Sequence, residues 1–507
     1  MSLSKYKIRL FWLLLLILIL SFLGWQVLSP TGAWTCSQDF SDDKWYFNNL
    51  WLNDNACLSV AAPAERAVLG QDGSLLILAE PVYFSIFSPR AFSRAEVEIT
   101  YRPYFSSSTP IFEAGFLADS KLWRYQLQPV YNLWLERGLT DWSQLSDGNL
   151  HLFQRQARFA AVADFLQAWR QDSGQLCTEA VCLATYNLSS LELPPLLSQS
   201  IMNLELAGSS FPYDLRGPHQ FYFYLPAKGL KLSGVLSDRN ENKDNDRADF
   251  FIFSGKNLVA SSSIADNRLQ SEMSGELSDG QNFDIIQPDL PAGLYRLDFR
   301  GGDDLILSGL RINSSYLSVI NKIWIWGGEE IKLVTDAPYL QIKALNPEAL
   351  QAVTLEQKKV IIDEIYRQYE VKTNNSKIIN LSLSRGGLIL ENNGVFAISS
   401  STLLNPDYPR LDRFAPALNQ LDFVLADYKF AQKQTDDWFK SDLQFNIGGF
   451  YRENNHYSFI LSVPGLKLDS RVRQSGEADS VSGLLEIKKI KVRFYGKSLW
   501  EKIKEHF

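Results

Sequence analysis

Short segments in which apolar and polar residues alternate recur along most of this 507-residue chain. Typical examples are AEVEITY at 95–101, HQFYFYL at 219–225, LYRLDF at 294–299 and IKVRFY at 490–495. A period of two puts the apolar side chains on one face of an extended strand, because successive residues point to opposite faces. Turn residues separate these segments, and long helical patterns are scarce. The pattern predicts a mainly β protein of tandem, jelly-roll-like β-sandwiches with a few short helices.

An apolar run near the N-terminus is long enough to cross a membrane. Residues 10–28 (LFWLLLLILILSFLGWQVL) carry no charge and as a helix would span about 28 Å. Three basic residues lie within 1–9, and the first acid is Asp39. Because positive charge stays on the cytoplasmic side, we expect an uncleaved, single-pass signal anchor in the cell membrane. Residues 1–9 would be cytoplasmic, the helix would contact the lipid bilayer, and the rest would form an extracellular domain at the cell surface. The alternative is a cleaved signal peptide, for which Thr31–Ala33 is a poor exit site.

The four cysteines fit an exported chain. Cys36 and Cys57 both follow the apolar run closely, and Cys177 and Cys182 are five positions apart. An even number of cysteines in an exported protein favours disulfides, and local pairing predicts Cys36–Cys57 and Cys177–Cys182. The four histidines show none of the spacings that are typical of a metal site.

The length of the chain beyond the apolar run suggests about three domains. We expect a β-rich domain over 34–205, which includes a short helix and the loop between Cys177 and Cys182, followed by β-sandwich domains over 206–315 and 316–507. The formal net charge is −7, and this acidic balance gives no support to nucleic-acid binding.

Four segments in the middle of the chain follow one another in a recognisable order. They are HQFYFYLPAKGLKLSGVL at 219–236, RADFFIF at 247–253, GKNLVASSS at 255–263 and LPAGLYRLDF at 290–299. This region, about 218–312, resembles the bacterial pre-peptidase C-terminal (PPC) domain. The resemblance implies a small jelly-roll-like sandwich that serves as an accessory binding or targeting module. The insertion DRNENKDN and the aromatic DFFIF depart from the family pattern.

That insertion carries side-chain oxygens in the order of an EF-hand calcium loop. Counted from Asp238, they fall at positions 1, 3, 5, 7, 9 and 12. Lys243 replaces the usual glycine at position 6, Asp249 replaces the usual glutamate at position 12, and the flanks are predicted strands. The two interpretations are a weak calcium site and a solvated hairpin tip, since Asn and Asp favour turns. The candidate ligands are Asp238, Asn240, Asn242, Asp244, Asp246 and Asp249.

Thirteen tryptophans raise the question of sugar binding, because exposed aromatic rings stack on sugar faces. Trp123, Trp134 and Trp142 cluster in a turn-rich segment and are the candidate ligand platform, although burial in a core is the simpler interpretation. Trp324 and Trp326 lie on one face of a predicted strand, and we expect them to face the sheet interior. The closing strand LEIKKIKV at 485–492 resembles those of jelly-roll carbohydrate-binding modules.

No catalytic motif stands out. The chain has no GxSxG, HExxH, P-loop or dinucleotide fingerprint, and GGDD at 301–304 is typical of a hairpin turn. A glycosidase needs only two placed carboxylates, which a single sequence with 57 acidic residues cannot identify. We therefore expect a surface protein that binds or scaffolds, with a glycan or an envelope protein as its ligand and no cofactor other than calcium. The alternative is an accessory or catalytic component of an exported glycan-processing system.

The anchor hypothesis predicts where the mature chain begins. N-terminal sequencing of the protein extracted from membranes should start at or near Met1, because the long apolar run lacks a good cleavage site. A chain that starts at Trp34 would show instead that the run is a removed signal peptide.

Overall fold

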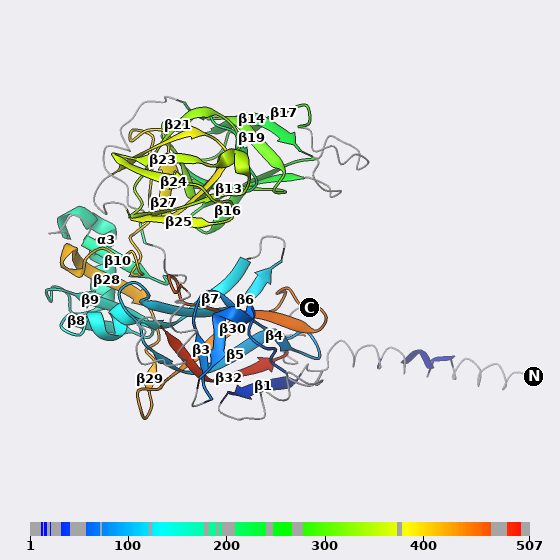
Figure 1. Cartoon of the computed structure of the whole chain (residues 1–507), viewed down its shortest axis with the longest axis vertical. Coiled ribbons are helices and arrows are strands. Elements are labelled where there is room, and N and C mark those ends of the chain that lie inside the picture. Colours follow the sequence, from blue (N-terminus) through cyan, green and yellow to red (C-terminus); the bar gives the residue numbers. More distant parts are fainter. Residues whose placement is uncertain are drawn as a thin grey trace, which may run out of the picture. The chain divides into compact units, whose positions relative to one another are not determined.

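The computed structural model shows a mainly β protein (Figure 1), as the alternating pattern predicts. Almost all strand pairs are antiparallel, and β10 with β28 is a parallel exception. Helices are few and short in the part of the chain that is described. The structure describes residues 12–13, 15–17, 21, 32–40, 57–70, 73–120, 124–176, 182–188, 191, 193–194, 208–239, 247–265, 277–372, 378–467 and 484–497.

The predicted membrane anchor lies largely outside these residues. Of residues 10–28, only 12–13, 15–17 and 21 are described, and each of them is helical. Within the described ranges, no helix has the length and apolar character needed to cross a membrane.

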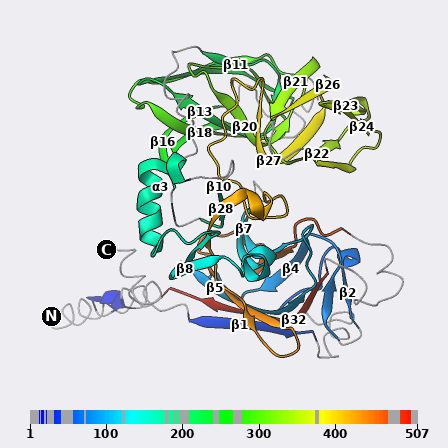
Figure 2. The same cartoon turned by 90° about the vertical axis from the view of Figure 1, so that its left-hand side faces the viewer.

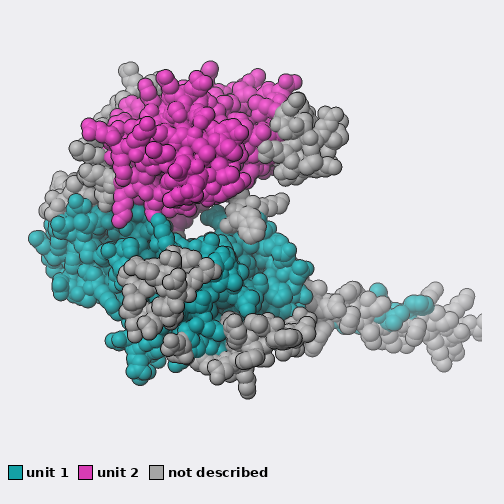
Figure 3. All heavy atoms as spheres, viewed as in Figure 1, with its two compact units in different colours: residues 1–189, 410–507 teal, residues 190–409 magenta. Residues whose placement is uncertain are grey.

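The chain divides into two compact units rather than three consecutive domains (Figure 3). Unit 1 combines residues 1–189 with 410–507, and unit 2 is formed by 190–409. The predicted domains 34–205, 206–315 and 316–507 are therefore replaced by one discontinuous unit and one inserted unit. An alternating pattern reveals that a segment is a strand, but it does not reveal which distant strand is its partner.

Unit 1 contains a sandwich of two sheets. The first has the order β2-β3-β32-β5-β30-β29, with β1 on the other part of β32, and the second has the order β4-β31-β6-β7. Phe116 on β6 reaches across to Phe445 on β30, with ring centroids 5.1 Å apart. The strands are β1 (Ala33–Asp39), β2 (Ala67–Leu69), β3 (Leu75–Ile77), β4 (Val82–Phe87), β5 (Arg94–Pro103), β6 (Ile111–Asp119), β7 (Arg124–Asn132), β29 (Gln432–Lys433), β30 (Phe439–Asn446), β31 (His456–Ser462) and β32 (Leu485–Tyr495), and the 3-10 turn η1 (Ala64–Arg66) precedes β2.

A third sheet of unit 1 has the order β10-β28-β9-β8, and α3 lies against it (Figure 2). The helix packs through Phe165, whose ring centroid lies 5.0 Å from that of Phe423 on β28. These elements are the π-helix η2 (Trp134–Gly138), β8 (Ser143–Asp147), β9 (Leu150–Gln154), α3 (Val162–Leu176), β10 (Cys182–Tyr186), the 3-10 turn η5 (Leu418–Gln420) and β28 (Leu421–Asp427).

The disulfide Cys36–Cys57 is present, as predicted, and links β1 to the segment before β4. Cys182, the first residue of β10, is also disulfide-bonded. Its predicted partner Cys177 lies outside the described residues.

Unit 2 consists of two sheets around one continuous core that runs from Phe211 to Phe396. Sheet D has the order β11-β19-β14-β17, with β12 also on β19. Sheet E has the order β16-β15-β18-β13-β20-β27-β21-β26-β23-β24, and β22 pairs with both β25 and β27. The strands of sheet D are β11 (Ser209–Phe211), β12 (Leu215–Arg216), β14 (Leu230–Asp238), β17 (Gln281–Gln287) and β19 (Leu305–Ile312).

Sheet E crosses the domain boundary that the sequence suggested at 315/316. β20 pairs with β13 on one side, where Val319 faces Phe221, and with β27 on the other. The region that resembles a PPC domain is thus continuous with the following strands. The elements are β13 (His219–Leu225), β15 (Ala248–Ser254), β16 (Asn257–Ile264), β18 (Gly293–Arg300), β20 (Leu317–Trp324), β21 (Glu329–Thr335), β22 (Tyr339–Ala344), the 3-10 turn η4 (Pro347–Ala349), β23 (Gln351–Leu355), β24 (Lys358–Ile362), β25 (Gln368–Lys372), β26 (Ile379–Arg385) and β27 (Leu388–Ala397).

Because unit 1 is built from both ends of the chain, removing a C-terminal strand should unfold its N-terminal part, which would not happen if the domains followed one another along the chain. Deleting residues 484–507 removes β32, which lies between β3 and β5 and buries Ile487 and Val492. Unit 1 should then lose its fold, because its larger sheet loses a central strand, while unit 2 stays folded. Limited proteolysis with mass spectrometry would check this: fragments of 208–409 should survive, and fragments of 57–176 should not. Deleting only 498–507 is the control and should leave both units protected. A protease-resistant 34–189 fragment in the longer deletion would contradict the discontinuous unit.

Candidate functional site

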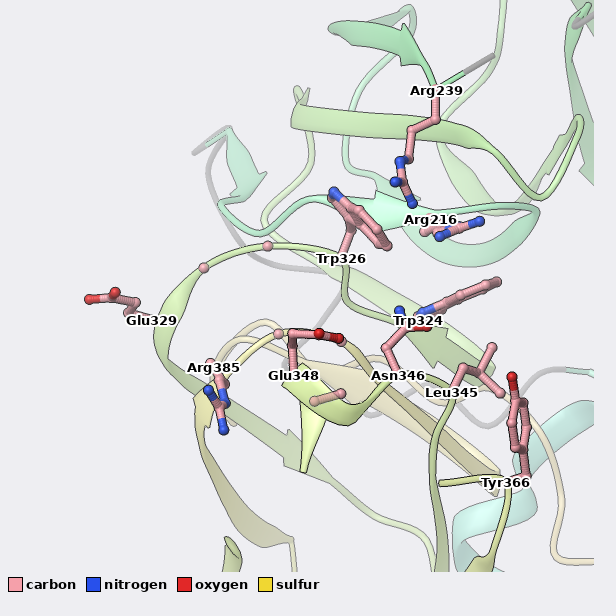
Figure 4. Close-up of a pocket in the computed structure, with 15 residues that line it drawn as sticks. Arg216, Arg239, Trp324, Trp326, Glu329, Leu345, Asn346, Glu348, Tyr366 and Arg385 are labelled. Atoms are coloured by element: carbon pink, nitrogen blue, oxygen red, sulfur yellow. The ribbon is translucent and has the colours of Figure 1, made fainter. Parts of the chain in front are cut away.

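A groove of about 890 Å³ opens on unit 2 (Figure 4). The residues that line it come from segments before β20 in the sequence and from the segment that begins at the end of β20. Arg216 lies on β12 of sheet D and Arg239 directly follows β14 of the same sheet, whereas the remaining lining residues begin at Trp324, the last residue of β20, and continue after it in the sequence. The labelled lining residues are Arg216, Arg239, Trp324, Trp326, Glu329, Leu345, Asn346, Glu348, Tyr366 and Arg385.

One wall of the groove is a stack of alternating indole and guanidinium groups, which we call the Trp–Arg stack. The Arg216 guanidinium carbon lies 4.6 Å from the ring centroid of Trp324 and 4.7 Å from that of Trp326. The Arg239 guanidinium lies 4.4 Å from the Trp326 ring. The order along the wall is Trp324, Arg216, Trp326 and Arg239, as Figure 4 shows. A cation over an aromatic face is attracted by the negative face of the ring, by about 0.5–2 kcal/mol depending on desolvation.

The geometry of an extended strand explains why one guanidinium fits between two indoles. Residues i and i+2 of a strand are about 6.6 Å apart and share a face, and this is about twice the stacking distance of planar groups. The bridge between Leu215 and Ile325 brings the neighbouring Arg216 to this face. The Arg216 Nε also donates a hydrogen bond of 2.7 Å to the carbonyl oxygen of Asp303, which fixes the plane of the guanidinium.

The two tryptophans do not face the sheet interior, contrary to the prediction from sequence. Ile323 and Ile325 alternate with them, and both isoleucines are fully buried in the core of unit 2. Trp324 lines the groove wall, and it is only 7% exposed because the Arg216 guanidinium covers its ring. The IWIW segment allows either pair to point inward, and the branched aliphatic pair packs more compactly between two sheets.

A buried histidine fixes the backbone at Trp324. His219 Nε2 accepts a hydrogen bond of 3.0 Å from the Trp324 N–H, and its Nδ1 donates one of 2.9 Å to the Gly217 carbonyl oxygen. The imidazole is therefore neutral, with its proton on Nδ1. Burial, with a smaller contribution from the charge of Lys322, lowers the pKa of His219 to about 4.

The groove floor needs two turns to approach each other closely. The N–H of Gly386 donates to the Gly328 carbonyl oxygen at 3.0 Å, and that of Gly387 donates to the Ile325 carbonyl oxygen at 2.7 Å. A side chain at position 386 would place a Cβ atom 2.7 Å from the Trp326 carbonyl oxygen, so only glycine fits there.

Exposed polar and aromatic groups complete the groove. Tyr366 is 67% exposed and has a left-handed backbone with φ of +61°, which is costly for a bulky residue. Asn346, which precedes η4, and Glu348, which lies within it, are exposed. Arg385 donates a hydrogen bond of 2.7 Å to the Leu350 carbonyl oxygen. The groove can thus stack an aromatic ring on a ligand while charged and amide groups form hydrogen bonds to it.

The candidate calcium ligands are only partly described. Asp238 is buried at the end of β14, and residues 240–246, which include the other ligands except Asp249, lie outside the described part. Asp249 accepts hydrogen bonds from Arg247 Nε at 2.8 Å and from the Ser263 hydroxyl, so a cationic group already neutralises it. No group of three or more His, Cys, Asp or Glu residues among the described ones is arranged to hold a metal.

The predicted tryptophan platform is not an exposed surface in the structure. Trp134 and Trp142 are half-buried against the core of the third sheet of unit 1, and the Trp134 indole donates to the Asp412 carbonyl oxygen at 3.1 Å. Trp123 lies outside the described residues. The groove on unit 2 was missed because its residues come from separate strands, and the IWIW segment was its only signal in the sequence.

Unit 1 holds a group of three largely buried carboxylates, which pattern reasoning also missed. Burial raises the pKa of Glu80, of Glu113 and of Asp412, and the charge of Asp412 raises that of Glu113 further. Arg410 lies 3.6 Å from Glu113 and partly offsets this effect. Glu80 accepts hydrogen bonds from the Ser462 hydroxyl and the Gly465 N–H.

Comparison with known proteins gives no family assignment. No family model matches the chain, and no curated protein matches it. Among solved structures, a pentameric capsid protein from metagenomic phage sequences is 17% identical over 25% of this chain and 86% of its own, with a TM-score of 0.15. Dimeric latent PorU from Porphyromonas gingivalis is 14% identical over 62% of this chain and 33% of its own, with a TM-score of 0.16. The tandem CBM22 domains of Paenibacillus barcinonensis Xyn10C are 8% identical over 53% of this chain and 79% of their own, with a TM-score of 0.12. These TM-scores are too low to carry an argument about fold or function.

The depressed pKa of His219 predicts a pH dependence of unit 2. The unfolded chain takes up this proton near pH 6.5 and the folded chain near pH 4, so the unfolded state binds more protons between these values. The free energy of unfolding should therefore fall by about 2 kcal/mol between pH 7 and about pH 4.5 through this residue.

Hydrogen exchange of the β20 amides, followed by mass spectrometry at the two pH values, measures this effect. His219→Gln should reduce the pH dependence, whereas His456→Gln, at a histidine of unit 1, should leave it unchanged. Equal pH dependence in the wild type and in His219→Gln would show that the imidazole is not the titrating group.

Proposed function

We propose that this protein is a membrane-anchored cell-surface protein that binds a glycan in the groove of unit 2. The observation that carries the proposal is the exposed ring of Tyr366 beside exposed Asn346 and Glu348, opposite a rigid Trp–Arg stack. An aromatic ring covers the apolar face of a sugar, and amide, carboxylate and guanidinium groups form planar hydrogen bonds with its hydroxyl groups. The groove volume also lies in the range of small-ligand sites, about 300–1,000 Å³.

Preorganisation supports binding at this place. The guanidinium of Arg216 is held between two indoles and by the Asp303 carbonyl oxygen, and the backbone of Trp324 is held by His219. Because these side chains are already fixed, the protein loses little conformational entropy when a ligand binds to them. Tyr366 keeps a strained backbone at the rim, and strain of this kind gathers at binding sites.

Export of the chain is part of the proposal. The Cys36–Cys57 disulfide supports an oxidising compartment, and the basic residues before the apolar run 10–28 support an anchor with a cytoplasmic N-terminus. The resemblance of 218–312 to a PPC domain agrees with an accessory binding module. An envelope protein as the ligand is the alternative partner in this setting.

A role in an exported glycan-processing system is the second candidate. It is favoured by the buried carboxylates Glu113 and Asp412, because raised pKa values are typical of acid–base groups. Release of reducing sugar from a glycan by the wild type, and its loss in Glu113→Gln, would support this candidate over a pure binding role.

Glycan binding predicts a local effect of one aromatic residue. The region from residue 32 onward should bind a defined set of glycans on an array. Tyr366→Ala should weaken the affinity about 5- to 30-fold, because stacking on one ring contributes on the order of 1–2 kcal/mol. Isothermal titration with the best array ligand measures the change. Tyr451→Ala removes an exposed tyrosine of unit 1 and should change nothing.

Two outcomes would contradict the proposed site. The first is an array on which the wild type binds no glycan. The second is equal affinity of the wild type and Tyr366→Ala for a glycan that does bind, which would place the ligand elsewhere on the chain.

A further inference from the structure

The outer face of sheet D carries a second hollow of unit 2. The strands β11, β19, β14 and β17 lie side by side in this order, and a hollow of about 650 Å³ lies over them. It shares no lining residue with the groove that we propose for glycan binding. The function proposed for the groove therefore does not account for this face.

The strand register places four polar side chains in one row across the sheet. Arg311 on β19 is paired with Ser210 on β11 and with Ser233 on β14. Ser233 is in turn paired with Asp284 on β17. Residues paired in register share one face of a sheet, so the four side chains point the same way. The residues that follow or precede them are buried in the core of unit 2, which shows that the row points outward: Ile312, Leu232 and Ile285.

A second row adds a cation and an apolar side chain to the same face. Lys231 lies two residues before Ser233 on β14 and is paired with Ile286, which lies two residues after Asp284 on β17. A spacing of two residues keeps side chains on one face of a strand. Ile286 is 61% exposed, so this face offers apolar surface next to the charged groups. The Lys231 N–H donates a hydrogen bond of 2.7 Å to Asn313 Oδ1, which fixes the backbone at this row.

A β-bulge curves the sheet beside the first row. From Ser233 to Val235 the strand β14 advances by two residues, while the paired residues on β19 run from Arg311 to Ser308. Gly309 has the left-handed φ of +58° within this longer segment. A bulge bends its strand and increases the local twist, and bulges are common beside functional sites. The outer face is therefore curved rather than flat next to Arg311.

The basic groups on this face are not engaged by the protein. Arg311 and Lys231 are both exposed, and within the described part of the chain neither side chain forms an ion pair or a hydrogen bond. Asp284 is exposed on the same face and is not paired with either of them. The guanidinium and the ammonium group are thus accessible to an anionic ligand.

We propose that the outer face of sheet D binds a sugar that carries a carboxylate, such as a uronic acid residue of a glycan. The guanidinium of Arg311 matches a carboxylate through two parallel hydrogen bonds. Ser210 and Ser233 place a hydroxyl on each side of Arg311, and each hydroxyl can donate or accept a hydrogen bond. Lys231 adds a second positive charge to the same side of the sheet.

Two further side chains favour an acidic sugar over a simple anion. The exposed side chain of Ile286 can cover the C–H groups of a sugar ring, and the carboxylate of Asp284 can accept hydrogen bonds from sugar hydroxyl groups. Inorganic phosphate would gain nothing from Ile286 and would be repelled by Asp284. A neutral sugar would leave the two cations without a partner.

A matched pair of ligands tests the inference on the full chain in detergent micelles. By isothermal titration at low salt, trigalacturonate should bind at least about tenfold more tightly than its methyl ester, because the ester lacks the charge. Arg311→Gln should weaken the binding of trigalacturonate about tenfold, and Lys231→Gln should weaken it severalfold. Lys332→Gln removes an exposed lysine of unit 2 outside the hollow and should change nothing. Because the substituted side chains are exposed, all variants should keep the melting midpoint of the wild type.

The outcomes separate this site from the groove. Loss of binding in Arg311→Gln with full binding in Tyr366→Ala supports the inference. The reverse pattern would assign trigalacturonate to the groove, which would overturn the inference and leave the proposed function standing. Equal affinity for the acid and the ester, or no binding of either, would also overturn it. Inorganic phosphate that binds as tightly as trigalacturonate would show that the face takes any oxyanion, and would overturn the assignment to a sugar.

Discussion

The alternation of side chains along the end of β20 is the constraint on which the rest of unit 2 depends. Ile323 and Ile325 fill the core between sheets D and E, and this forces Trp324 and Trp326 to the opposite face. There they leave the space of one planar group between them, which Arg216 occupies. The same strand pairs with β13 and with β27, so core packing, sheet continuity and the groove wall all depend on one short segment.

The fold of unit 1 depends on pairing between strands that are far apart in the sequence. β32 is near the C-terminal end of the chain, yet it lies in its sheet between β3 and β5, which are near the N-terminal end. In the other sheet, β31 likewise lies between β4 and β6. Aromatic rings such as Phe116 and Phe445 then meet across the two sheets, although they are far apart in the sequence. An inserted unit 2 is compatible with this arrangement because the entropy cost of closing a long loop grows only slowly with its length.

The particular successes and failures of sequence reasoning have a common cause. The mainly β fold and the Cys36–Cys57 disulfide followed from local patterns, since a period of two and a short spacing act within one segment. The three-domain division and the inward orientation of Trp324 and Trp326 were wrong, because both depend on which distant strand supplies the other side of the core. Asp249 fitted a ligand spacing, yet Arg247, two residues before it, neutralises its carboxylate in the folded chain.

By itself, the sequence determined the strand-forming segments, the acidic net charge and the local cysteine spacing, because each of these is a property of neighbouring residues. Only the tertiary structure decided the two units and the groove. The order of strands in a sheet brings together residues that are separated by tens of positions, such as Arg216 with Trp324 and Asp238 with Leu305. Such pairings arise from the packing of whole sheets around a shared core, and an alternating pattern of apolar residues is the same for many orders of the strands.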